Sequence, residues 1–265
     1  MKKTIKSLLT GAMSLAFLFS AAPVAIPQIS ATAYAEVAAN RPSEPVYVDF
    51  VSGRIPANFI PADGWTNGDP FNVFWHKENV TFRNGLMQLI IDKDRIGNDK
   101  GLPYSGGEFR SEQFYGYGRY EVRMKALKND GALSSFFTCT GPYDDGNPWD
   151  EIDIEILGKD TTQVQFNYYR DGKGGHEYMY DLGFDAAQDF HIYAFEWHKD
   201  CIIWFVDGKE AYRVESNDIP VTKGKILMNA WTGKGVDEWL KPFKDNRLPI
   251  IAEYQWFRFT PFVNE

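Results

Sequence analysis

The sequence lacks the hallmarks of several protein classes. Only two cysteines, Cys139 and Cys201, occur in 265 residues, which excludes a cysteine-rich disulfide scaffold and a cysteine-based zinc site. Their spacing does not establish a disulfide, and each lies in an apolar run where a buried free thiol is ordinary. The chain has no cluster of Lys and Arg, and its formal net charge is −8, so we expect no nucleic-acid partner.

Histidine is also scarce. The four histidines show no ligand or triad spacing, and Cys139 has none nearby in the sequence, which argues against a serine or cysteine nucleophile. We therefore expect no metal ligands among them and no required cofactor. The histidines in question are His76, His176, His191 and His198.

The long apolar run of the chain lies at its N-terminus. A basic start at residues 1–6 precedes it, and Ala33-Tyr34-Ala35 follows it, a pattern typical of a secretory signal peptide at residues 1–35. Gly, Ser and Pro interrupt the run, which argues against an uncleaved membrane anchor. Residues 36–44 form a short linker, and residues 45–265 suit a single catalytic domain. We expect a secreted monomer without stable membrane association.

Helical periodicity is absent from the long stretches after Tyr47. Only short segments at Asp185–Asp189 and Val236–Leu240 could form helical turns, whereas strand-like runs recur between turn residues. This spacing predicts an all-β fold, a β-sandwich of the jelly-roll kind. Examples of the predicted strands are Leu86–Ile91, Gly118–Ala126, Leu133–Thr140, Glu151–Leu157, Thr162–Tyr169, His191–His198, Cys201–Val206 and Ile250–Phe259.

Two further local features stand out. Asp207-Gly208 between two apolar runs predicts a two-residue hairpin, because both residues tolerate the positive φ of a type I′ turn. Aromatic residues make up 16% of the chain, which favours a binding site lined with flat apolar surfaces. An aromatic-rich β core is the alternative, and for any single aromatic residue it is the better explanation.

The segment Trp149–Leu157 carries the clearest chemical signal. Side chains alternate along a strand, so Glu151, Asp153 and Glu155 share one face while isoleucines share the other. A solvated edge strand would show the same alternation, and a metal site is a third reading, although one straight strand cannot easily wrap a cation. Like charges about 7 Å apart repel, which favours a functional role for this face.

Glycoside hydrolysis is such a role. Retaining enzymes use one carboxylate as nucleophile and a second as general acid, held about 5–5.5 Å apart. Glu151 and Glu155 fit this pair, although their Cα atoms would lie about 13 Å apart on an extended strand, so strand curvature and long side chains must close the gap. We expect Asp153 to keep a negative charge that raises the proton affinity of the acid, and to hydrogen-bond the nucleophile.

Longer blocks carry a specific resemblance. WDEIDIE followed by ILGKDTTQVQFNYY, the earlier FYGYGRYEVRMK and SSFFT, and the later KILMNAW and GVDEW are similar to glycoside hydrolase family 16, in particular the bacterial lichenases, over most of residues 47–262. The resemblance implies a concave jelly-roll cleft that binds β-glucan. It implies Glu151 as nucleophile, Asp153 as helper and Glu155 as general acid and base.

The resemblance also implies an activity and a set of sugar contacts. The activity is that of an endo-β-1,3-1,4-glucanase, because β-1,3-glucanases of the family carry one extra residue before the second Glu. A β-1,3-glucanase, a β-glucan transglycosylase and a non-catalytic glucan-binding jelly roll are the alternatives. The implied contacts are Asn67, Glu108, Arg110, Phe137, Trp149, Asn167, Tyr169, Glu177, Asn229, Trp231 and Trp239.

Three positions depart from the family pattern. Cys139 stands where many lichenases have a cleft tyrosine, so a thiol would border the site. The family's common disulfide would join positions that here are Val73 and Gly106. Gln255 replaces an acidic ligand of a structural calcium, which leaves two backbone carbonyls and makes that ion an open question.

Overall fold

The computed structural model describes residues 44–263. The predicted signal peptide and all of the predicted linker except residue 44 lie outside the described residues. Within the described range, no helix is long and apolar enough to cross a membrane.

Almost all regular structure in this range is β-strand, with one short 3₁₀ helix and one short α-helix. The elements are β1 (Val46–Asp49), β2 (Phe59–Pro61), β3 (Val73–Trp75), η1 (Lys77–Asn79), β4 (Val80–Arg83), β5 (Leu86–Lys93), β6 (Tyr104–Ser111), β7 (Gly118–Lys125), β8 (Ala132–Thr140), β9 (Asp150–Leu157), β10 (Gln163–Tyr169), β11 (Tyr178–Asp181), β12 (His191–Trp197), β13 (Cys201–Val206), β14 (Lys209–Glu215), β15 (Lys225–Thr232), α2 (Asp237–Leu240) and β16 (Ile250–Pro261).

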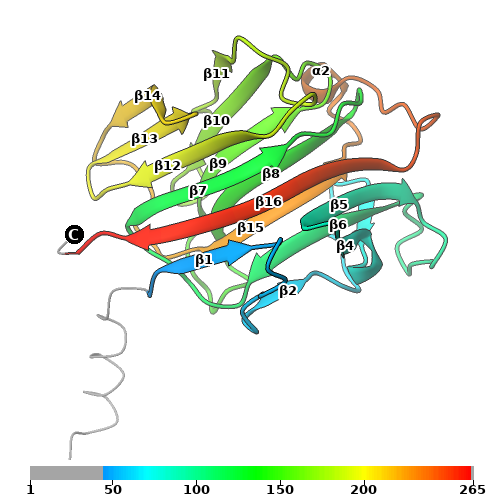
Figure 1. Ribbon diagram of the computed structural model, residues 1–265, viewed down its shortest axis with the longest axis horizontal. Helices are drawn as coiled ribbons and strands as arrows, with labels where there is room; N and C mark the ends of the chain where they lie inside the picture. Colours follow the sequence, from blue (N-terminus) through cyan, green and yellow to red (C-terminus); the bar gives the residue numbers. More distant parts are fainter. Residues whose placement is uncertain (1–43, 264–265) are drawn as a thin grey trace, which may run out of the picture. The chain divides into compact units, whose positions relative to one another are not determined.

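The strands form two layers (Figure 1). One layer has the order β11-β10-β9-β8-β15-β6, and the other has the order β5-β16-β7-β12-β13-β14. The short pairing of β5 with β6, through Asp92 and Ser105, joins the two. Neighbours along this path are antiparallel, and β3 pairs with β6 in parallel. The predicted all-β jelly roll is confirmed.

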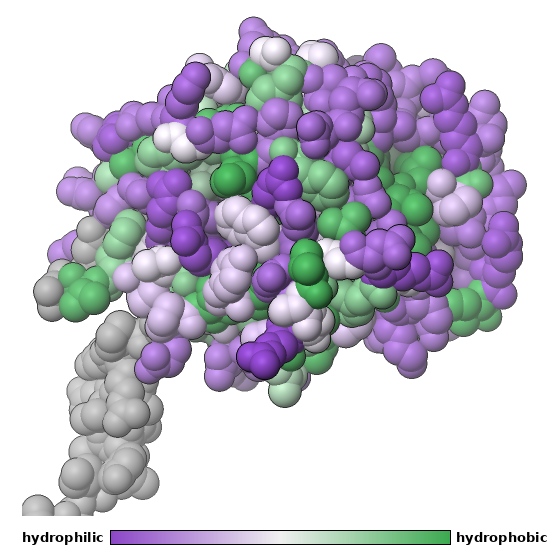
Figure 2. All heavy atoms as spheres, in the orientation of Figure 1, coloured by the Kyte–Doolittle hydropathy of each residue, from purple (hydrophilic) through white to green (hydrophobic). Residues whose placement is uncertain are grey.

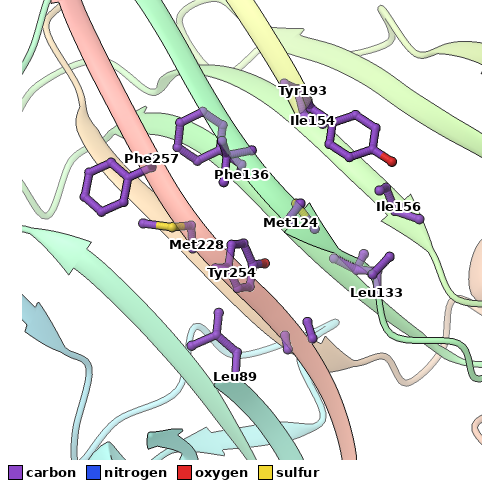
Figure 3. Packing of buried hydrophobic residues seen from close by; sticks show 14 of the residues in the cluster. Leu89, Met124, Leu133, Phe136, Ile154, Ile156, Tyr193, Met228, Tyr254 and Phe257 are labelled. Atoms are coloured by element: carbon purple, nitrogen blue, oxygen red, sulfur yellow. The ribbon is translucent and has the colours of Figure 1, made fainter. Parts of the chain in front are cut away.

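The core lies between the two layers. Alternation along each strand directs apolar side chains inward, and Figure 3 shows Phe136, Ile154 and Ile156 of one layer facing Tyr193 and other residues of the opposite layer. The isoleucines of β9 are fully buried, and burial of one such side chain contributes about 1.5–3 kcal/mol to stability. The predicted isoleucine face of β9 is therefore the core face.

Two buried hydrogen bonds join the two layers beneath β8 and β9. The Trp204 indole N–H donates to the backbone carbonyl of Asp153 at 3.0 Å. The Tyr254 hydroxyl donates to the backbone carbonyl of Ser135 at 2.8 Å. Because a buried polar group without a partner is costly, these bonds fix the position of β8 and β9 over the second layer.

The exposed side of the second layer is mostly hydrophilic. Figure 2 shows that apolar side chains on this face form small separate groups among polar residues. This distribution is typical of an ordinary solvated surface.

Several local predictions can be compared with the structure. Asp207 and Gly208 both have positive φ, of 47° and 76°, in the hairpin between β13 and β14, as predicted. The helical turn near Val236 is present as α2, whereas residues 185–189 form a non-helical turn. Pairing of Asp185 with Thr161 and Lys128 side chains fixes that turn instead.

The two cysteines belong to different layers, in β8 and β13, and do not form a disulfide with each other. Each is partly buried: Cys139 lies opposite Glu151 on the carboxylate side of β8, and Cys201 begins β13. Val73 and Gly106 do lie side by side, since a Cβ at Gly106 would approach Val73 Cγ2 to 3.0 Å.

Candidate active site

The carboxylate strand β9 has the predicted alternation. Ile152, Ile154 and Ile156 point into the core, while Glu151, Asp153 and Glu155 share the opposite face of the curved sheet. β9 pairs with β8 and β10 in continuous register, with no bulge between the two glutamates. We call the exposed side of this sheet, as marked by the three carboxylates, the carboxylate face.

Cross-strand pairing places one partner on each side of every carboxylate. Residues directly opposite each other in an antiparallel sheet share a face, so each row is a set of side-chain neighbours. The rows are Cys139, Glu151 and Tyr169; Phe137, Asp153 and Asn167; and Ser135, Glu155 and Gln165.

Glu151 accepts hydrogen bonds at one end of this face. The Trp149 indole N–H donates to Glu151 Oε2 at 2.5 Å, and the Cys139 thiol donates to the same oxygen at 3.5 Å. The Trp149 ring also stacks on Tyr169, with centroids 4.5 Å apart and planes 7° apart. Burial raises the pKa of Glu151 above its ordinary value, and hydrogen bonds from Trp149, Asp153 and Cys139 offset part of this rise because they favour the carboxylate.

Asp153 lies between the glutamates and is buried. Burial and then the charges of Glu151 and Glu155 raise the pKa of Asp153 well above its ordinary value. A hydrogen bond between Asp153 and Glu151 raises the pKa of Asp153 and lowers the pKa of Glu151, which favours a proton on the Asp153 side of the pair. The expected hydrogen bond is present, whereas the raised pKa of Asp153 disfavours the negative charge expected for it.

Glu155 has a different environment. Burial, followed by the charge of Glu151, raises the pKa of Glu155 to about 8, while a hydrogen bond from Gln165 opposes the rise. Gln165 Nε2 donates to Glu155 Oε2 at 2.8 Å, and the Trp239 indole N–H donates to Gln165 Oε1 at 2.9 Å. This shift favours the protonated form of Glu155 at neutral pH, and the oriented Gln165 amide holds the side chain in place.

A polar row continues from Glu155 across the sheet. The Ser135 hydroxyl donates to Asn229 Oδ1 at 2.6 Å, and Asn229 Nδ2 donates to Glu108 Oε2 at 3.3 Å. Burial raises the pKa of Glu108 to about 7, opposed by Arg110 and Asn229. The Arg110 guanidinium lies 4.9 Å from the centroid of the Trp65 ring. These groups offer hydrogen bonds to hydroxyl groups beside an aromatic surface.

Aromatic side chains line the same end of the face. Trp231 stacks on Phe71 with centroids 4.0 Å apart and lies 6.0 Å from Trp239. Exposed Asn67 belongs to the same loop as Phe71, and its Oδ1 accepts a hydrogen bond from the Trp75 indole at 2.6 Å. Flat rings of this kind suit the C–H faces of a sugar.

The remaining predicted contacts flank the carboxylates. Phe137 and Asn167 stand on either side of Asp153, and Asn167 Oδ1 is buried without a hydrogen-bond partner among the described residues. Exposed Glu177 lies near enough for its charge to raise the pKa of Asp153 and Glu155. The structure thus links every predicted contact to a carboxylate, to the polar row or to the aromatic group.

Sequence reasoning missed three residues that organise the site. Gln165 joins Glu155 to Trp239, and its spacing from Asn167 and Tyr169 in one strand would have placed it on their face. Ser135 orients Asn229. Asp150 precedes Glu151 in the sequence, and its fully buried side chain links β9 to two loops. Nothing in the local sequence pattern indicated this role.

The Asp150 contacts explain why β9 begins where it does. Its carboxylate accepts two bonds from Arg170 Nη1, at 3.0 and 3.1 Å, and backbone bonds from Asp171, Val221 and Thr222. Burial raises the pKa of Asp150, but these donors outweigh it and hold the pKa below its ordinary value.

The residue at the implied calcium position does not fit a calcium ligand. Gln255 Oε1 accepts a hydrogen bond from the Arg123 guanidinium. A fixed positive charge at this oxygen opposes binding of a second cation.

Comparison with known proteins gives the family. The family model described as "Glycosyl hydrolases family 16" matches residues 67–248, which include the whole carboxylate strand. The chain belongs to this family. It is therefore a glycoside hydrolase, and its curated relatives are β-glucanases.

Relatives of this family 16 hydrolase cover most of its length. A "Beta-glucanase" of Acetivibrio thermocellus is 50% identical over 261 residues, which cover 98% of this chain and 73% of the relative. A "Xylanase/beta-glucanase" of Ruminococcus flavefaciens is 56% identical over 215 residues, 80% of this chain, and the match covers 26% of that longer protein.

A solved structure extends the comparison to the fold. The prokaryotic β-1,3-1,4-glucanase (lichenase) derived from a mouse hindgut metagenome is 48% identical to this family 16 hydrolase, with a TM-score of 0.77. The match covers 82% of this chain and 99% of the solved chain. The hydrolase is thus similar to a lichenase in both sequence and architecture.

Proposed function

We propose that this family 16 hydrolase is an endo-β-1,3-1,4-glucanase that cleaves β-1,4 bonds of mixed-linkage β-glucan with retention of configuration. The observation that carries the proposal is the environment of the two glutamates on one face of an unbulged strand. Glu151 accepts hydrogen bonds from Trp149 and Cys139, which favour its ionised form, whereas burial and the charge of Glu151 raise the pKa of Glu155 to about 8. Two carboxyl groups with opposite protonation states are what a retaining glycosidase requires. The lichenase similarity supports the substrate class.

In the first step, Glu151 attacks the anomeric carbon as the bond to the glycosidic oxygen breaks. Glu155 gives its proton to that oxygen, so the leaving sugar departs with a free hydroxyl group. Asp153 donates a hydrogen bond toward Glu151 and thereby orients the nucleophile, and its proton stays on Asp153 throughout the step. The product of this step is a covalent glycosyl ester.

In the second step, water replaces Glu151 at the anomeric carbon. Glu155 is now ionised and accepts a proton from the water, which restores both groups to their starting states. Two inversions at the same carbon give net retention. Gln165 stabilises the ionised form of Glu155 between the steps through its 2.8 Å hydrogen bond.

Substrate selection tests this function. Purified protein should release reducing sugar from barley β-glucan but not from laminarin, carboxymethyl cellulose or xyloglucan, and Glu151→Gln, which keeps the size of the side chain, should release none. Strong cleavage of laminarin would identify a β-1,3-glucanase instead. Binding of glucan without any cleavage by the wild type would identify a binding module.

We also propose that the enzyme is secreted as a monomer after removal of residues 1–35. The basic start and the Ala33-Tyr34-Ala35 motif support this. N-terminal sequencing of the extracellular protein should begin at Glu36, and size-exclusion chromatography with light scattering should give the mass of one chain. Retention of the N-terminus in the cell, or a dimer mass, would contradict these two points.

A further inference from the structure

A group of potential ligands lies at the base of the loop formed by residues 64–75, outside the active site. Asp63, His76 and Glu78 each bring one ligand atom to within 4.8 Å of the others. Asp63 and Glu78 are exposed, whereas the His76 side chain is only 6% exposed. A nearly buried imidazole between two surface carboxylates needs a physical explanation.

The ring of His76 lies between two carboxylates. Nε2 is buried, has no hydrogen bond within residues 44–263, and lies 3.4 Å from Asp94 Oδ1. Nδ1 lies 3.9 Å from Asp63 Oδ1, which is too far for a hydrogen bond. Because neutral imidazole carries one proton, one nitrogen presents a lone pair to a carboxylate oxygen, an unfavourable contact unless a cation intervenes.

Asp94 lies behind the His76 ring, on the side of Nε2. Its side chain is 2% exposed and accepts hydrogen bonds from the backbone N–H groups of Ile96 and Gly97 and from Asn98 Nδ2. An acceptor fixed 3.4 Å from Nε2 favours the neutral ring form with its proton on Nε2, and in that form the lone pair of Nδ1 faces Asp63. A carboxylate behind a histidine in this way is the common arrangement around metal-binding imidazoles.

We propose that Asp63, His76 and Glu78 bind a divalent transition-metal ion of the zinc type, with His76 Nδ1 and one oxygen of each carboxylate as ligands. Zn²⁺ accepts imidazole nitrogen and carboxylate oxygen at about 2.0–2.2 Å, so two of its ligand atoms lie about 3.3 Å apart, and small side-chain rotations suffice. Water completes the coordination on the exposed side. Ca²⁺ is disfavoured because it requires six to eight oxygen ligands.

The ion would link the two ends of the loop formed by residues 64–75. Asp63 precedes the loop and His76 follows it, and backbone bonds between Gly64 and Trp75 and between Trp75 and Trp65 already close its base. The loop carries Asn67, Trp65 and Phe71 toward the carboxylate face. Lys77 contacts both oxygens of Asp63: its Nζ lies 3.0 Å from Oδ2, and its backbone N–H donates to Oδ1 at 3.3 Å. Its ammonium group competes with the metal for the charge of Asp63, whereas the backbone bond leaves Oδ1 a second lone pair for the ion.

Calorimetric titration of the tag-free mature protein with ZnCl₂ tests the site. We expect one ion per chain, at least tenfold weaker binding to Glu78→Gln, and unchanged binding to Glu112→Gln, a matched control at another exposed glutamate. CaCl₂ should bind at least tenfold more weakly than ZnCl₂. Absence of a single-site isotherm, equal affinity of Glu78→Gln and wild type, or equal affinity for calcium would overturn the proposal.

Two measurements distinguish a structural metal site from nonspecific adsorption of ions to the surface. At a free zinc concentration of about 100 times Kd, linkage predicts a Tm increase of about 5–10 °C, which EDTA should reverse. Amide hydrogen exchange in residues 64–75 should slow by roughly tenfold in the wild type and remain unchanged by zinc in His76→Gln. A doubly protonated His76 that bridges both carboxylates without metal would give neither response, and that result would also overturn the proposal.

Discussion

Replacement of Gln165 by methionine should shift the alkaline limb of the activity profile to higher pH. Gln165 Nε2 donates a 2.8 Å hydrogen bond to Glu155 Oε2, and this bond favours the ionised form of Glu155. Methionine has a similar length but no donor. Without the bond the ionised form loses stability, so the pKa of Glu155 must rise further above its present value of about 8.

The size of the shift follows from the strength of the bond. A hydrogen bond to a charged group contributes about 1.5–3 kcal/mol, and the half-buried position of Glu155 at the carboxylate face favours the lower end of that range. One pKa unit corresponds to about 1.4 kcal/mol. The alkaline limb, where the general acid loses its proton, should therefore move up by about one pH unit.

The assay is kcat/KM on barley β-glucan between pH 4 and 10, because a natural leaving group requires the general acid. Gln163→Met is the matched control: it makes the same change on the same strand, but Gln163 bonds Asp181 instead of a catalytic carboxyl group. The control should leave the alkaline limb in place. A Gln165→Met profile whose alkaline limb stays unchanged or moves to lower pH would refute the assigned role of Glu155.

Three further predictions concern the carboxyl groups. Glu151→Ala and Glu155→Ala should each lose at least about 10³-fold in activity. In the presence of azide, Glu151→Ala should form the α-glycosyl azide and Glu155→Ala the β-glycosyl azide. The same anomer from both variants, detected by NMR, would contradict the assigned roles. The folded-state pKa of Glu108, about 7, lies above its ordinary 4.5, so the wild-type protein loses stability as pH rises between these values. In urea unfolding, the stability of Glu108→Gln relative to wild type should therefore increase by up to about 3 kcal/mol between pH 4.5 and 8. A difference that does not change with pH would contradict this. Asp150→Ala should lower the free energy of unfolding by about 3 kcal/mol in the same assay, because it leaves Arg170 and three backbone donors without their acceptor. A decrease of less than about 0.5 kcal/mol would show that these donors find other partners.

The sequence predicted the parts of the fold that depend on local alternation. The predicted strand at residues 201–206 matches β13, and that at 151–157 differs from β9 by one residue at its start. The strand β6 was harder to recognise because Gly106 and Gly107 weaken its pattern. Packing explains these glycines: a Cβ at Gly107 would lie 2.5 Å from the Asn79 carbonyl oxygen, a contact that no local pattern reveals.

The site could be predicted only in part for a related reason. Alternation identifies Glu151, Asp153 and Glu155 as members of one face, but the rows across the sheet depend on register between distant strands. Gln165 and Ser135 acquire their roles from that register alone.

The pKa shifts of the site carboxyl groups could not be predicted from the sequence either. Asp153 looked like a permanent negative charge because aspartate is ordinarily ionised. Its burial between two glutamates instead raises its pKa well above the ordinary value. The departure from expectation therefore lies where several like charges are removed from water together.

The stereochemistry of the first product tests the central claim most directly. NMR spectra recorded within minutes of adding enzyme to a short mixed-linkage glucan oligosaccharide show which anomer forms before mutarotation. A double displacement by Glu151 and Glu155 predicts that the β-anomer appears first and the α-anomer follows slowly. Initial formation of the α-anomer would mean a single displacement by water, and Glu151 could not then be the nucleophile.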